Sequence, residues 1–84
     1  MKKPRKVFTV RRRYRVRKTF ASFLSSFVEG EVVVYERYYF SPYDNCDVYE
    51  FRSDTGEHKR WWLHESEPTD SWHEFFESFT DLGS

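Results

Sequence analysis

Apolar and polar residues alternate along residues 7–18, the pattern of a β-strand with one buried face. The apolar positions of this predicted strand are Phe8, Val10, Tyr14 and Val16. Arg12 interrupts the apolar face, so the sequence predicts a bulge or a later start of the strand at this point.

The next segment has helical periodicity. Its apolar residues follow the spacing i, i+3, i+4, i+7 and are Phe20, Phe23, Leu24 and Phe27. This spacing predicts a short amphipathic helix, which Thr19 would cap and Gly30 would end.

Three strands are predicted after Gly30. Residues 31–40 are apolar or aromatic on both faces, which favours a central strand over an edge strand. A turn at residues 41–45 then leads into a strand at 46–52. The sequence Asp54-Thr55-Gly56 predicts a hairpin into a further strand at 58–64.

A second helix is predicted after Asp70 or Ser71, with Glu74 completing a capping box and Gly83 ending it. Its apolar stripe consists of Trp72, Phe75, Phe76, Phe79 and Leu82. The order β-α-β-β-β-α predicts an α+β fold. We expect a small, curled, barrel-like antiparallel sheet of about four strands, with two short amphipathic helices closing its ends.

The composition indicates one domain. Residues 7–84 are predicted to form it, preceded by a flexible basic arm at residues 1–6. Aromatic residues make up 21% of the chain, which argues against disorder. No apolar run has the length of a membrane span. The single cysteine, Cys46, fits a reducing compartment, so we expect a cytoplasmic protein.

The charges are segregated along the chain. Residues 1–28 contain ten Lys or Arg and no acid, whereas residues 29–84 contain four bases and all fourteen acids. The formal net charge of zero therefore conceals a basic end and an acidic end, which favours interaction with a charged partner.

The basic end predicts a row of guanidinium groups. Alternate residues of a strand share one face at a spacing of about 6.7 Å, so such a row could bind the phosphates of a nucleic acid. Two alternatives stay open. The charges could protect an exposed strand from aggregation, or they could pair with acids of neighbouring strands. The candidate nucleic-acid-binding residues are Arg11, Arg13, Arg15, Arg17 and Lys18. The acids that could neutralise them are Glu31, Glu36, Glu50 and Glu57.

The acidic end predicts a different surface. Acids on one helix face, together with exposed aromatic residues, would suit a basic protein partner, as in an immunity-type or anti-defence inhibitor. The alternative is a solvated helix face. The candidate protein-binding residues are Glu74, Glu77, Asp81, Tyr43 and Trp62.

The sequence offers little for metal or catalytic chemistry. His58 and His64 would lie about 20 Å apart on a straight strand, and Cys46 and His73 complete no zinc-type spacing. No phosphate-cradling glycine loop or nucleophile elbow occurs. We therefore expect no cofactor, no metal and no enzymatic activity.

One resemblance adds to this interpretation. Part of the chain resembles a family of small bacterial domains of unknown function. The matching features are Tyr14-Arg15-Val16, a Phe-rich segment, Gly30-Glu31 and the F-x-P-Y-D turn at residues 40–44. The resemblance covers about fifty residues of the chain. It implies a bacterial or phage origin and a β-rich fold, and it implies no chemistry.

The sequence thus predicts a non-catalytic binding domain whose partner is a nucleic acid, or alternatively a protein. Because the two ends carry opposite charge, it also predicts self-association that salt weakens.

Overall fold

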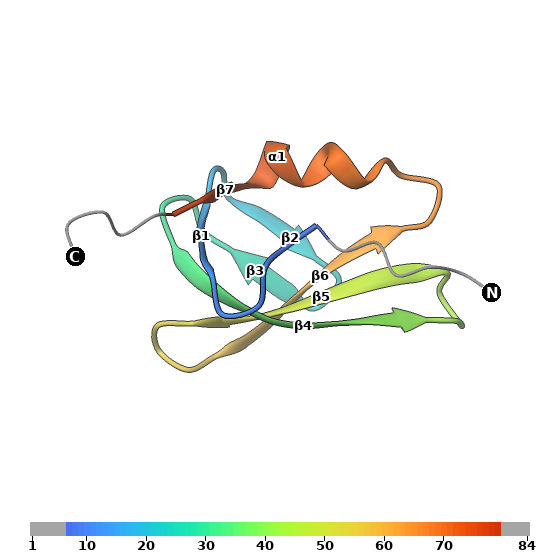
Figure 1. Ribbon diagram of the computed structural model, residues 1–84, viewed down its shortest axis with the longest axis horizontal. Coiled ribbons are helices and arrows are strands. Elements are labelled where there is room, and N and C mark those ends of the chain that lie inside the picture. The colour runs from blue at the N-terminus through green and yellow to red at the C-terminus, as the bar shows by residue number, and fades with distance from the viewer. Residues whose placement is uncertain (1–6, 80–84) are drawn as a thin grey trace.

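A computed structural model of the chain describes residues 7–79 (Figure 1). Its elements in chain order are β1 (Arg13–Val16), β2 (Phe20–Ser22), β3 (Ser25–Phe27), β4 (Val32–Ser41), β5 (Cys46–Ser53), β6 (His58–His64), a 3-10 turn (Thr69–Ser71), α1 (Trp72–Phe75) and β7 (Phe76–Ser78). The predicted arm at residues 1–6 lies outside the described residues, as do Asp81, Leu82 and Gly83.

An antiparallel sheet with the strand order β6-β5-β4-β1-β7 forms the body of the molecule. The predicted central strand is confirmed, because β4 is the middle strand of this sheet. The predicted strands at 46–52 and 58–64 are confirmed as β5 and β6. Gly56, at φ 89°, lies in the turn that joins them.

The α+β assignment is wrong, because strands predominate in the described residues and the single α-helix there has four residues. The first predicted helix, at residues 20–27, is instead the hairpin β2–β3. Phe20 pairs with Phe27 across this hairpin, and their rings stack with centroids 4.8 Å apart. A two-residue turn reproduces the i, i+7 spacing that suggested a helix.

The second predicted helix is also wrong beyond its first turn. Helix α1 ends at Phe75, and the chain then extends as β7, which pairs with β1. Ser71 makes no side-chain capping bond. Phe76 is fully buried, as the apolar stripe predicted, but as a strand residue, whereas Trp72 is only half-buried.

The first strand is shorter than the predicted range of 7–18. It starts at Arg13, in agreement with the later start that Arg12 suggested. Before it, Arg11 has a left-handed backbone at φ 70°, and its N–H donates to the Tyr35 carbonyl at 2.8 Å. This turn lets Phe8 enter the core from outside the strand, while Val10 stays exposed.

The core is largely aromatic and centres on Phe8. Its ring packs edge-on against surrounding rings, with centroid distances of 5.0 Å to both Tyr14 and Phe51 and 5.5 Å to Phe76. Such edge-to-face pairs contribute about 0.5–1.5 kcal/mol each beyond the area they bury. Aromatic packing therefore compensates for the scarcity of leucine and isoleucine in a domain of this size.

Hairpin β2–β3 lies along the free edge of β6. The backbone N–H groups of Trp62 and Arg60 donate to the hydroxyls of Ser22 and Ser25, at 2.8 and 3.0 Å. The serines thus provide hydrogen-bond partners for an edge strand. Figure 1 shows this hairpin and α1 on the same side of strands β4–β6, so we call the opposite, uncovered side the outer face.

Candidate binding surfaces

The predicted arginine row does not form one straight line. Arg13 and Arg15 lie on β1 and are exposed on the outer face. Arg11 belongs to the preceding turn, and Arg17 follows the end of β1. The turn that brings Phe8 into the core therefore breaks the regular spacing that the row requires.

Acids of the C-terminal segment neutralise part of this row. Glu77 of β7 lies opposite Arg15 in the strand register, with their charged groups 3.7 Å apart. Lys18 forms an ion pair with Glu74 of α1, and Arg17 donates to the carbonyl oxygen of His73. The residues nominated for two different partners thus contact each other within one molecule.

The acids expected from neighbouring strands pair elsewhere. Glu36 binds Arg52, with 2.8 Å between their charged groups. Glu50 is shared between Arg37 at 2.5 Å and Arg60 at 2.9 Å. Within residues 7–79, neither Arg11 nor Arg12 has a carboxylate at ion-pair distance. Arg17, which donates to a backbone carbonyl oxygen, likewise pairs with no described acid, so Arg11 and Arg12 share this property with Arg17 in the part of the chain that the structure describes.

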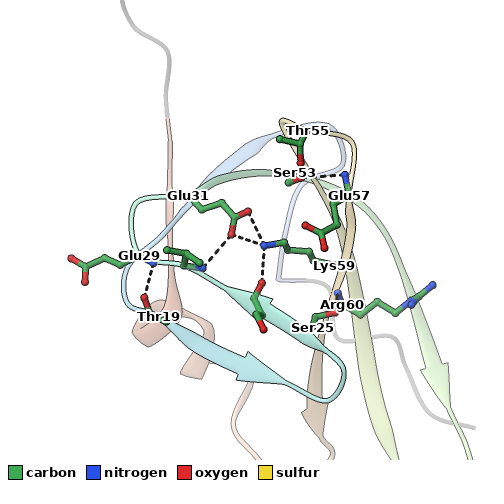
Figure 2. Close-up of polar contacts among 11 residues, drawn as sticks. Thr19, Ser25, Glu29, Glu31, Ser53, Thr55, Glu57, Lys59 and Arg60 are labelled. Carbon is green, nitrogen blue, oxygen red and sulfur yellow. Dashed lines mark hydrogen bonds and ion pairs between the residues drawn. The ribbon is translucent and has the colours of Figure 1, made fainter.

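Glu31 forms the most buried ion pair of the described residues, with Lys59 (Figure 2). The Lys59 ammonium donates to both oxygens of the Glu31 carboxylate, at 2.8 and 2.9 Å, and to the Ser26 carbonyl at 2.7 Å. Its three protons therefore all have acceptors. This pair attaches β3 and the loop before β4 to β6, and we assign it a structural role.

Aromatic side chains run across the outer face to the edge strand β6, where a ring from hairpin β2–β3 meets them. In the strand register, Tyr39 of β4 lies opposite Val48 of β5, which in turn lies opposite Trp62 of β6. The Phe23 ring stacks on Trp62, with centroids 4.6 Å apart. We call Tyr39, Trp62 and Phe23 the aromatic row. Val48 is fully buried between its two neighbours, so an apolar residue fills the space between Tyr39 and Trp62.

The hairpin tip extends this row into solvent. Phe23 is 68% exposed and Leu24 is 90% exposed. Phe23 adopts φ 55°, a left-handed conformation that costs a non-glycine residue about 1–2 kcal/mol. The fold thus accepts backbone strain at a turn whose two large apolar side chains are exposed to solvent.

A charged row lies beside the aromatic row. Arg37, Glu50 and Arg60 lie opposite one another on β4, β5 and β6. The Glu50 side chain is nearly buried, whereas that of Arg37 is 68% exposed. One carboxylate thus holds two guanidinium groups, and the row carries one net positive charge next to the aromatic side chains.

Two hollows lie along β1 among the described residues. One, of about 390 Å³, is lined by Arg13, Val32, Val34, Asp54 and Phe79. The other, of about 280 Å³, is lined by Arg15, Val16, Arg17, Glu29, Gly30 and Glu77. Each contains both signs of charge, so neither is a dedicated anion site.

The remaining predicted protein-binding residues do not gather at one place in the fold. Tyr43 is 98% exposed in the turn between β4 and β5, whereas Trp62 is half-buried within the aromatic row. Asp81 lies outside the described residues. Sequence reasoning missed Phe23, Leu24 and Arg37, because the helix assigned to 20–27 placed Phe23 and Leu24 on a buried stripe and no register placed Arg37 beside the aromatic row.

The described residues offer no metal centre, because no three His, Cys, Asp or Glu residues gather closely enough to hold an ion. Burial, helped by the nearby Tyr14, raises the pKa of Tyr35 to about 12. That phenol therefore stays protonated at neutral pH and cannot act as a base. Within the described residues, no helix has the length and apolar character needed to cross a membrane.

Comparisons with known proteins identify a structure with a similar fold. No protein-family model matches the sequence, and no curated protein matches it either. A solved structure of an integron cassette protein from the mobile metagenome of Vibrio cholerae superposes with a TM-score of 0.69 and 18% identity, covering 87% of each chain. At this identity the likeness establishes a shared fold alone. The chain is thus a small β-rich domain with the fold of a bacterial integron cassette protein.

Proposed function

We propose that this chain is a non-catalytic protein-binding domain whose binding surface is the aromatic row and the hairpin tip. The observation that carries the proposal is the exposed pair Phe23–Leu24 in a strained turn, with the Phe23 ring stacked on Trp62. Tryptophan, tyrosine and arginine are the residues most enriched among the energetic anchors of protein interfaces. Trp62, Tyr39 and Arg37 provide these three types on one face of the sheet.

The surface also has the layout of an interface. Its centre is apolar and aromatic, and the charged groups of Arg37 and Arg60 lie at its side. Protein interfaces commonly combine an apolar centre with a polar rim. Leu24 strengthens the choice of a protein over a nucleic acid, because an aliphatic side chain that is 90% exposed cannot stack on a base but fits an apolar pocket.

Selection from a random peptide library displayed on phage tests this proposal. The wild-type protein should enrich a set of binding peptides. The Leu24→Ser variant should bind these peptides about thirtyfold more weakly than the wild-type protein does. That factor corresponds to a loss of about 2 kcal/mol in binding free energy, the size that marks an interface anchor. Val28→Ser is the matched control, because Val28 is an exposed apolar residue at the base of the same hairpin. Peptides that bind both variants equally would contradict the proposal.

Phe23→Gly separates binding from folding. Glycine removes the strain of φ 55°, while the lost stacking on Trp62 costs about 0.5–1.5 kcal/mol. The two effects nearly cancel, so we expect the free energy of unfolding in urea to change by less than about 1 kcal/mol. Affinity for the selected peptides should nevertheless fall. A large loss of stability would show that Phe23 serves the fold.

Nucleic-acid binding is a second candidate function, favoured by the exposed pair Arg11–Arg12 and its lack of a described carboxylate partner. Each phosphate that the protein contacts contributes about −0.9 to the slope of log K against log[salt] on duplex DNA. Replacing Arg11 and Arg12 with alanine should therefore make that slope less steep by about two units. Arg52→Ala is the control, because Arg52 already binds Glu36. An unchanged slope would exclude these residues as phosphate contacts.

A further inference from the structure

We propose that two copies of this chain associate through their aromatic rows around a two-fold axis, with Arg37 of each copy pairing with Asp44 of the other. This inference rests on the proposed function, because it names a second copy as a partner of the same surface. It is carried by the order of charges along β4 and the turn that follows it, which is complementary to itself when reversed.

The charges flank the aromatic row on opposite sides. Arg37, Tyr39 and Ser41 occupy successive outer-face positions of β4, each about 6.7 Å from the next. The Ser41 hydroxyl donates to the Asp44 carboxylate at 2.9 Å, which holds that acid beside the Ser41 position. A positive group and a negative group therefore lie on opposite sides of Tyr39 along the direction of β4.

A two-fold rotation makes this order complementary. If the axis lies in the interface along the aromatic row, the second copy presents its own row to the first with its strands running the opposite way. Arg37 of one copy then faces Asp44 of the other, and the same pair forms again on the far side of the axis. Such an interface, in which each contact occurs twice, is the usual form of a dimer.

The ion pairs within each copy leave these groups available. Arg37 is bound to Glu50, but that carboxylate is also shared with Arg60, and the Arg37 side chain remains 68% exposed. Asp44 lies in an exposed turn, and its contact with Ser41 involves a neutral hydroxyl. Two sheets that pack face to face lie about 10 Å apart, a gap that an arginine and an aspartate can span between them.

Charge reversal followed by sedimentation equilibrium tests the arrangement. The wild-type protein should form dimers as its concentration rises from micromolar to millimolar. Arg37→Asp and Asp44→Arg should each weaken the dimer by about tenfold or more, because like charges then face each other. An equimolar mixture of the two variants should restore association, since the two acids of one variant face the two bases of the other.

Controls and a second variant keep the test decisive. Asp54→Arg reverses an aspartate in the other hairpin turn of the sheet and should leave the dimer unchanged. If Arg37→Asp fails to fold, Arg37→Gln removes the charge without placing an acid beside Glu50 and should still weaken association. A wild-type protein that stays monomeric at millimolar concentration would overturn the dimer, as would single reversals without effect. If that monomer still selects peptides through Leu24, the proposed function stands.

Discussion

Replacing Phe76 with alanine should lower the free energy of unfolding by about 3–5 kcal/mol. Phe76 is fully buried, and its ring stacks on that of Phe51 at a centroid distance of 5.0 Å. It also lies edge-on to the rings of Phe27 and Phe8, both at 5.5 Å. These partners come from separate elements that cannot collapse together into the space left by the ring, so the cavity cost should be near its upper range.

A loss of that size approaches the whole stability of a domain this small, so the variant should be largely unfolded. Urea unfolding monitored by tryptophan fluorescence measures the effect. Phe79→Ala is the matched control, because Phe79 follows three positions later and is only half-buried beneath Arg15. A cost below about 1 kcal/mol for Phe76→Ala would mean that the core does not close around β7.

The strands that the sequence predicted share a simple cause. Buried and more exposed positions alternate along β6, and the turn that joins β5 to β6 contains a glycine at φ 89°. Both signals are local and agree with the final fold. Strand β4 was recognisable as central because both of its faces are apolar or aromatic, a pattern that an edge strand in water would not tolerate.

The first predicted helix was wrong because a spacing of i, i+3, i+4, i+7 does not exclude a hairpin. In β2–β3 the same residues become a cross-strand pair, Phe20 and Phe27, and an exposed turn, Phe23 and Leu24. The serines between them are poor helix formers, and two of them bind the edge of β6. The contact with that edge is a tertiary feature, and no local sequence pattern predicts it.

The candidate surfaces depended on the same error. In a helix, Glu77 would have pointed away from β1, whereas in β7 it lies opposite Arg15. A helical C-terminal segment therefore could not predict that Glu77 neutralises part of the basic row. The aromatic row was equally hidden, because Tyr39 and Trp62 are 23 positions apart in the chain and only the register of three strands brings them into line.

Replacing Lys59 with methionine should cost about 3 kcal/mol, the lower end of the range for breaking a buried ion pair, because Glu31 keeps some exposure to water. The Glu31 carboxylate would keep the N–H of Val28, at 3.2 Å, as a hydrogen-bond donor. Lys18→Met is the matched control. Lys18 pairs with Glu74 at the surface, where such pairs contribute about 0–1 kcal/mol.

The double variant Lys59→Met/Glu31→Met should recover most of that loss. With both charges removed, the methionine side chains can pack beside Phe27, over whose ring the ammonium now lies at 5.5 Å. Apolar replacement of a buried pair is often neutral or stabilising. The double variant should also keep peptide binding through Leu24, because Ser22 and Ser25 still hold the hairpin on β6. If the double variant were as unstable as the single one, the Ser26 carbonyl, and not Glu31, would be the essential partner of Lys59.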